Sequence, residues 1–113
     1  MKRPVSVIVC THNRAGLLAK ILGELRAQQY EPFEIIVVDN NSTDDTREVV
    51  ARIAAAEGAP IFYAAETRDG ITHVRNCGAE MAHFPYLAFL DDDCRVESDW
   101  LSHLMRGFDL DER

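Results

Sequence analysis

The sequence predicts an α/β protein in which a mainly parallel sheet of about four strands lies between helices on both faces. Short apolar runs alternate along the chain with segments whose apolar residues recur at helical spacing. Strands and helices that alternate in this way form parallel sheets through right-handed crossovers. Polar residues also collect directly after several apolar runs, and ligands of such sheets bind beyond the carboxyl ends of the strands. The sequence therefore predicts a three-layer domain, with helices on both faces of the sheet and a ligand site on one rim.

The first half of the chain is expected to contain two strands and two helices. Residues 5–10 and 34–38 are apolar and rich in β-branched side chains, which predicts two buried strands. Asn13 is the expected N-cap of the first helix, and residues 42–45 resemble a capping box for the second. The apolar stripes of the two helices comprise Leu17, Leu18, Ile21, Leu22 and Leu25, and then Val49, Val50 and Ile53.

The second half of the chain repeats this alternation. Residues 61–65 and 86–90 predict a third and a fourth strand. Between them a helix is expected to begin at Gly70 and to end before Pro85. A last helix has Trp100, Leu101, Leu104, Met105 and Phe108 on its apolar face. The charged residues after it, Asp109, Asp111, Glu112 and Arg113, predict a frayed tail.

The bulk composition indicates a single domain over residues 1–113. A formal net charge of −7 argues against a general nucleic-acid binder, which needs a basic surface. Cys10, Cys77 and Cys94 are odd in number and widely spaced, which predicts free thiols rather than disulfides or a zinc site. No apolar stretch approaches the roughly 20 residues of a membrane span. The protein is therefore expected in the cytoplasm, with peripheral attachment to the inner membrane face left open.

Three consecutive carboxylates, Asp91, Asp92 and Asp93, follow the fourth predicted strand. At roughly 4 Å and an effective dielectric of about 20, each like-charge pair costs on the order of 4 kcal/mol. Such a row is solvated, partly protonated or neutralised by a cation, and Mg²⁺ prefers carboxylate oxygens that it shares with substrate phosphates. If strand geometry persists, Asp91 and Asp93 face one side and Asp92 the other. The spacing thus suggests an Asp-x-Asp metal site, with a solvated acidic turn or a helix cap as the alternative.

Polar residues also follow the first two strands and open the third helix. Residues 11–14, with the sequence Thr-His-Asn-Arg, could donate hydrogen bonds to a nucleobase or a phosphate. Asp39 ends a buried strand, where its carboxylate could accept from a base N–H or cap the following helix. Arg75 could reach a diphosphate, or it could pair with a local acid such as Glu80. These groups are expected on the same rim as the aspartate row.

Four ordered segments give the chain a resemblance to the family 2 glycosyltransferases. They are residues 5–14 (VSVIVCTHNR), 37–46 (VVDNNSTDDT), 70–78 (GITHVRNCG) and 89–93 (FLDDD). Their order and their separations both match, and the resemblance covers essentially the whole chain. It implies the GT-A fold, whose Rossmann-like half binds a nucleotide-sugar, most often a UDP-sugar, with Mg²⁺ or Mn²⁺.

The resemblance also implies roles for individual residues. Thr11 and Asp39 would contact the base, Asp91 would face the ribose or the sugar, and Asp93 would ligate the metal. The implied nucleotide-sugar-binding set is Thr11, His12, Asn13, Arg14, Asp39, Arg75, Asp91 and Asp92, and the implied metal ligands are Asp93 and Asp91. The family inverts configuration by direct displacement, in which an Asp or Glu base activates an acceptor hydroxyl.

The sequence departs from the family pattern in three places. Cys10 stands where the family commonly has Pro, and His12 stands where it commonly has Tyr, although His12 can still stack on a base. The acceptor-binding half and the catalytic base of the family lie well beyond the aspartate row, after which this sequence has about twenty residues. The chain is therefore expected to be the donor-binding half, with no assigned catalytic base and little sugar transfer on its own. An exposed sheet edge would favour a homo-oligomer.

Other functions fit the sequence less well. A non-catalytic binding or interaction module could retain the same half-fold and some nucleotide affinity. Phosphatases of the haloacid dehalogenase type place Asp-x-Asp after the first strand, whereas here the row follows the fourth. A dinucleotide oxidoreductase would need Gly-x-Gly-x-x-Gly after the first strand, and residues 11–16 do not supply it. The sugar and the acceptor are not identified by the sequence.

Overall fold

The computed structural model describes residues 3–111 of the chain, and the side chains among them up to residue 107. The strands are β1 (Val5–Thr11), β2 (Phe33–Asp39), β3 (Ile61–Ala65) and β4 (Tyr86–Asp91). The helices are α1 (Ala15–Arg26), α2 (Thr46–Ala54), α3 (Ile71–Met81) and α4 (Trp100–Asp111). The predicted alternation of strands and helices is confirmed. In the predicted tail, Asp109 and Asp111 belong to α4, whereas Glu112 and Arg113 lie outside the described residues.

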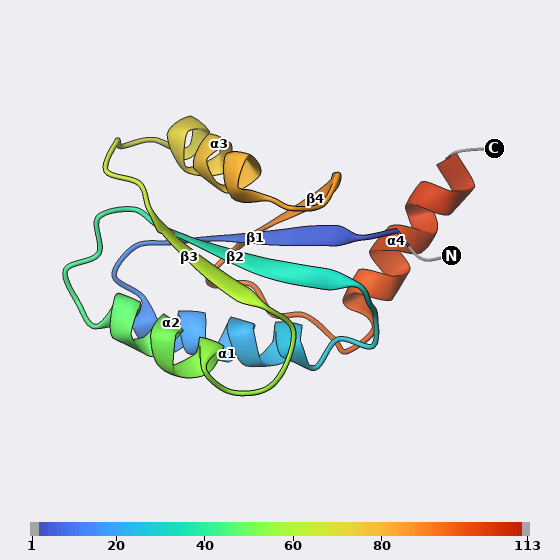
Figure 1. The fold of residues 1–113 in the computed structure, drawn as a ribbon, viewed down its shortest axis with the longest axis horizontal. Helices are drawn as coiled ribbons and strands as arrows, with labels where there is room; N and C mark the ends of the chain where they lie inside the picture. The colour runs from blue at the N-terminus through green and yellow to red at the C-terminus, as the bar shows by residue number, and fades with distance from the viewer. Residues whose placement is uncertain (1–2, 112–113) are drawn as a thin grey trace.

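The strands form one parallel sheet in the order β3-β2-β1-β4, with β1 near the centre (Figure 1). The register pairs Thr11 with Asp39 across β1 and β2, and Cys10 with Asp91 across β1 and β4. Because the strands are parallel and end together, Thr11, Asp39 and Asp91 lie on the same rim of the sheet. The sheet therefore brings together the polar strand ends that are far apart in sequence.

Helices cover both faces of this sheet and form the predicted three layers. The larger core lies on the α1 and α2 side, where Leu22 and Leu25 are fully buried against β1 and β2 residues. Leu101 and Met105 of α4 join the same core, and α4 lies beside the amino end of β1 (Figure 1). A smaller core on the other face packs Val74 of α3 against Ile8 of β1 and its neighbours. None of the described helices is both long enough and apolar enough to cross a bilayer.

Helix α3 lies unusually close to the sheet at Gly78. A Cβ atom at this position would lie 2.4 Å from Ile8 Cγ2 and 3.2 Å from Val38 Cγ2. Real Cβ atoms essentially never show contacts under 3.0 Å, so a larger residue would require the Ile8 side chain or α3 itself to shift. The close approach carries the first turn of α3 toward the carboxyl rim of β1.

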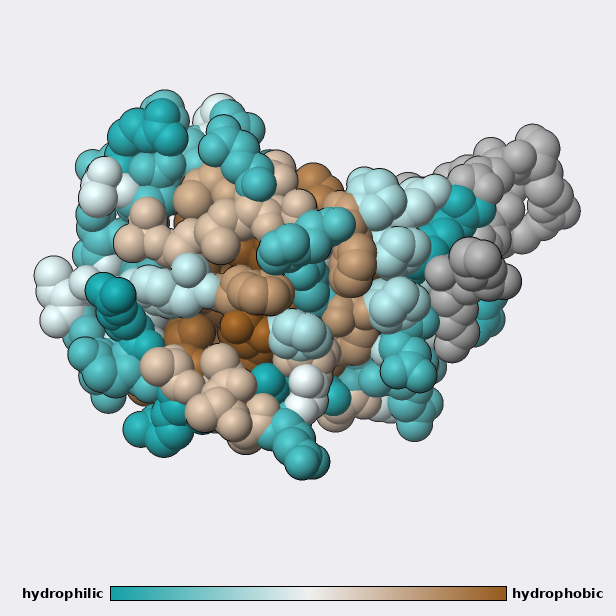
Figure 2. All heavy atoms as spheres, viewed as in Figure 1, coloured by the Kyte–Doolittle hydropathy of each residue, from teal (hydrophilic) through white to brown (hydrophobic). Residues whose placement is uncertain are grey.

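The edge of the sheet formed by β3 has a partly apolar surface. Apolar side chains gather in the middle of the face shown in Figure 2, over β3 and between the two helix layers. Phe62 of β3 is 37% exposed, and its ring lies 4.9 Å from that of His83. In the described part of the chain β3 pairs with β2 alone, so its outer edge is open.

Candidate functional site

A cleft of about 500 Å³ opens at the carboxyl ends of β1 and β4. Its lining comes from the β1–α1 loop, the end of β2, the first turn of α3 and the aspartate row. The lining residues are Cys10, Thr11, His12, Arg14, Asn40, Gly70, Ile71, Val74, Asp91, Asp92 and Asp93. Six of the residues that the sequence analysis singled out therefore share one cleft: Thr11, His12, Arg14, Asp91, Asp92 and Asp93.

The three aspartates of the row lie in different environments. Asp92 is 4% exposed, and its Oδ2 accepts a hydrogen bond of 2.8 Å from the hydroxyl of Thr11. Asp91 ends β4 and Asp93 lies in the turn that follows, and both are exposed to the cleft. The alternation expected from strand geometry is thus retained for two residues beyond the strand. The carboxylates of Asp91 and Asp93 are therefore available at the cleft surface, whereas that of Asp92 is buried and hydrogen bonded within the fold.

Arg14 is the cation that faces this row. Its Nη1 donates to Asp92 Oδ1 at 3.2 Å and lies 3.7 Å from Asp93 Oδ2. The Arg14 side chain is 52% exposed, so water screens its interaction with Asp93 more than its interaction with buried Asp92. One guanidinium balances one of the three carboxylates, which leaves a net negative charge at this end of the cleft.

No cluster of three or more His, Cys, Asp and Glu side chains is arranged to hold a metal ion within the described part of the chain. The carboxylates of Asp91 and Asp93 are nevertheless the hard oxygen donors that Mg²⁺ and Mn²⁺ prefer. Protein Mg²⁺ sites commonly use one or two carboxylates and complete the shell with water and substrate phosphates. The residues present fit a divalent cation of that shared kind.

The predicted helix caps are wrong, and the same residues join two loops instead. Asn13 has a left-handed backbone with φ of 52°, and its Oδ1 accepts from the amide of Thr43 at 2.7 Å. In return, the Asn13 amide donates to Ser42 Oγ at 2.9 Å. Arg14 occupies the N-cap position of α1, and Asp44 rather than Ser42 accepts from the first amide of α2. Contacts between loops far apart in sequence outweigh the local capping preference of Asn and Ser.

Asp39 lies behind the cleft rather than on its surface. It is 4% exposed, and its Oδ2 accepts from the Tyr63 hydroxyl at 2.6 Å while its Oδ1 accepts from the Ser42 amide at 3.0 Å. Burial, together with the hydrogen bond to Asp39, raises the pKa of Tyr63 to about 12. The predicted contact between Asp39 and a base stays a prediction, and it requires one of the remaining lone pairs of this carboxylate.

The segment between β3 and α3 is anchored by side chains of the loop that follows β2. Asn40 Nδ2 donates to the carbonyl of Glu66 at 2.7 Å, and Asn41 Nδ2 donates to that of Thr67 at 3.0 Å. The Glu66 carboxylate is buried, and its hydrogen bonds from Arg68 lower its pKa to about 2. The two consecutive asparagines after β2 are the sequence feature that could have predicted this anchoring, since each offers a donor to the backbone of a neighbouring loop. This anchoring places Gly70 and the start of α3 at the cleft.

Arg75 and Cys10 differ from the other candidate residues. Arg75 does not line the cleft; its guanidinium carbon lies 5.6 Å from the ring centroid of Phe89 on β4. Cys10 lines the cleft, but burial and the neighbouring Asp91 raise the pKa of its thiol to about 11. Cys10 therefore stays protonated at neutral pH, which argues against a nucleophilic role. Cys10, Cys77 and Cys94 are all free, as the sequence predicted.

Sequence comparison matches residues 6–113 to the model of the family described as Glycosyl transferase family 2. A GalNAc(5)-diNAcBac-PP-undecaprenol beta-1,3-glucosyltransferase of Campylobacter jejuni is 36% identical over 103 residues, which are 90% of this chain and 33% of the relative. Glycosyltransferase AglE of Haloferax volcanii is 34% identical over 99 residues, covering 86% of this chain and 33% of the relative. The chain thus spans about a third of the length of each of these two curated relatives.

Structure comparison gives similar glycosyltransferase neighbours. TarS of S. aureus in complex with UDP has a TM-score of 0.83 at 26% identity, with 97% of this chain and 32% of TarS covered. The mannosyltransferase PcManGT of Pyrobaculum calidifontis, in complex with GDP-Man and Mn²⁺, has a TM-score of 0.77 at 32% identity. That alignment covers 82% of this chain and 28% of PcManGT. The expected GT-A fold is confirmed.

Proposed function

This chain belongs to glycosyltransferase family 2, and we propose that its cleft binds a nucleotide-diphospho-sugar donor through a divalent cation held by Asp91 and Asp93. The observation that carries the proposal is the exposure of these two carboxylates in a cleft at the carboxyl rim of the sheet. The nucleotide and metal complexes of two structural neighbours support it. A UDP-sugar is the proposed donor, and Mg²⁺ or Mn²⁺ is the proposed cation.

The other residues proposed to bind the donor have roles that follow from their positions. Thr11 and Asp39 lie at the ends of β1 and β2 and would bind the base, against which exposed His12 could stack. Arg14 borders the aspartate row and would contact the diphosphate, since guanidinium groups donate two parallel hydrogen bonds to phosphate. Arg75 would join them only by leaving the ring of Phe89.

The proposed reaction is inverting transfer of the sugar to an acceptor hydroxyl. When bound, the cation would act as a Lewis acid that stabilises the negative charge on the nucleoside diphosphate leaving group. The contribution of this chain is to bind the nucleotide, to orient the diphosphate against Asp91 and Asp93, and to limit the access of water to it. The acceptor and the catalytic base are not assigned to residues of this chain.

Calorimetric titration with UDP, with and without Mn²⁺, tests the proposal. We expect binding that depends on Mn²⁺, and we expect Asp93→Ala to lower the affinity for UDP in Mn²⁺ at least tenfold, because it removes one of two protein ligands. The melting temperature should change little, because Asp93 is exposed. Glu57→Ala is the matched control, since it removes an exposed carboxylate outside the cleft lining. Absence of metal-dependent binding at millimolar UDP would contradict the proposal.

A further inference from the structure

Arg14 occupies a position from which it affects both a cation and an anion in the cleft. Its guanidinium lies 3.2 Å from buried Asp92 and 3.7 Å from exposed Asp93, so it neutralises part of the charge of the aspartate row. The backbone helps to fix this position, because Arg14 is the N-cap residue of α1 and follows Asn13, which is hydrogen bonded to the β2–α2 loop. Asp92 also accepts from Thr11, which holds the acceptor of Arg14 in place.

A divalent cation that reaches Asp93 without a nucleotide meets this guanidinium. The two positive groups would share one carboxylate at a separation of a few ångströms, and like charges at such distances repel appreciably even in water. The cation must also displace the contact between Arg14 and Asp93. Arg14 therefore disfavours a cation that binds alone.

A diphosphate reverses the sign of this effect. Its oxygens can accept from Arg14 on one side and coordinate the cation on the other, so that negative charge separates the two positive groups. Binding of either ligand then becomes more favourable when the other is present. Such coupling is reciprocal by thermodynamic necessity.

Resting on the proposed function, we propose that Arg14 makes cation binding depend on the diphosphate of the donor. Without donor, the positive charge of Arg14 partly neutralises Asp92 and Asp93, as the cation would do when bound. With donor bound, the same side chain contacts the diphosphate, and the cation is retained at Asp91 and Asp93. The cleft therefore selects a metal–diphosphate pair over a free metal ion.

Titration of Mn²⁺, followed by the electron paramagnetic resonance signal of free Mn²⁺, tests this role with and without UDP. We expect Arg14→Gln to tighten the binding of Mn²⁺ alone by roughly three- to tenfold, because one positive charge is removed a few ångströms away. Gln can still donate to Asp92, so that buried carboxylate keeps a partner. We expect the ratio of the Mn²⁺ dissociation constants without and with UDP to fall several-fold in this variant.

Two further variants separate the role of Arg14 from net charge and from folding. Arg52→Gln removes the same charge from the exposed face of α2 and should leave the ratio at its wild-type value. Arg14→Lys retains the charge, so Mn²⁺ alone should bind as weakly as to the wild type even if Arg14→Gln is unstable. An Arg14→Gln protein that binds Mn²⁺ alone no more tightly than the wild type would overturn this inference while leaving the proposed function intact. A wild type that binds neither Mn²⁺ nor UDP would overturn both.

Discussion

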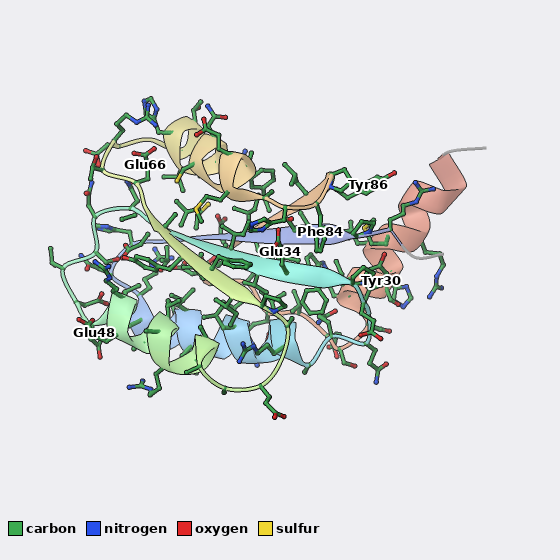
Figure 3. All side chains as sticks on the ribbon, in the orientation of Figure 1. Tyr30, Glu34, Glu48, Glu66, Phe84 and Tyr86 are labelled. Carbon is green, nitrogen blue, oxygen red and sulfur yellow. The ribbon has the colours of Figure 1, made fainter. Side chains whose placement is uncertain are left out.

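Glu34 and Asp92 are buried carboxylates at opposite ends of the sheet, and they differ in what surrounds them. Glu34, near the amino end of β2, is 3% exposed, and Asp92, just beyond the carboxyl end of β4, is 4% exposed. Glu34 lies between the sheet and the segment that contains Phe84 (Figure 3). The Ser6 hydroxyl donates to it at 2.6 Å, and the backbone amide and Nδ1 of His83 both lie at 2.7 Å from its oxygens.

Asp92 has a partner of another kind. Thr11 is buried like Ser6, but Arg14 is half exposed, lines the cleft and also faces Asp93. The donors around Glu34 come from strand β1 and from the α3–β4 connection, so this carboxylate holds segments of the fold together. Equal burial therefore does not imply an equal role: the His83 side chain is exposed as well, but only Arg14 lines the cleft and faces a second carboxylate there.

The largest expected effect follows from truncating Glu34, which breaks the cluster that it forms with Ser6 and His83. Glu34→Ala should lower the free energy of unfolding by about 2–4 kcal/mol, because it removes several hydrogen bonds to a charged group and leaves buried donors without a partner. UDP affinity in Mn²⁺ should stay within about twofold of the wild type, since the cluster lies at the far end of the sheet. Urea unfolding and calorimetry measure the two quantities. A large loss of UDP affinity with unchanged stability would show that the two ends are not separate in function.

A smaller effect, on both stability and UDP affinity, is expected from a change at Asp92, which contacts Thr11 and Arg14. Asp92→Asn keeps the shape of the side chain but loses the charge that attracts Arg14, so stability should fall by about 1 kcal/mol. UDP affinity should fall roughly three- to tenfold, because Thr11 and Arg14 are then held less firmly. Thr11→Ser is the conservative control, since it retains the hydroxyl that donates to Asp92. If Asp92→Asn changed stability alone, Asp92 would resemble Glu34 rather than differ from it.

The smallest expected effect is a pH dependence of stability that comes from Glu34. Burial by itself raises the pKa of Glu34, but the hydrogen bonds from Ser6 and His83 outweigh it and leave the pKa below its ordinary value of 4.5. Because the folded-state pKa is lowered, the stabilisation is complete above the ordinary pKa and is lost as pH falls through the folded-state value. The difference in unfolding free energy between wild type and Glu34→Gln should therefore shrink below about pH 4.5. A difference that is constant from neutral pH to pH 3 would contradict this assignment.

Most of the fold could be predicted from local patterns. Residues 5–10, 34–38, 61–65 and 86–90 all lie in the observed strands, because buried parallel strands are short apolar runs bounded by polar residues. The composition of the rim could be predicted from strand direction alone, because the carboxyl ends of parallel strands lie on the same side of the sheet. Thr11 and Asp91 could therefore be placed together before any contact was known. The helices were also predicted, since their apolar stripes must face the sheet.

What could not be predicted depends on contacts between distant segments. Asn13 and Ser42 have strong local preferences for helix caps, yet each bonds to the other's loop across more than 25 residues of sequence. The burial of Asp39 behind Tyr63 likewise depends on how β2 and β3 pair. The burial of Glu34 could not be predicted from the sequence. An acidic residue at the start of an apolar strand can be buried or exposed, and the fold decides between the two by placing Ser6 and His83 beside it.

The close approach of Gly78 to the sheet has a consequence for the dimensions of the cleft. Gly78 lies seven residues after Ile71, about two helical turns from the end of α3 that forms one wall of the cleft. Where the Ile8 side chain cannot shift, a side chain at position 78 would displace the helix and with it that wall. The position of this wall of the cleft therefore depends on the absence of a side chain at a buried contact about two helical turns away.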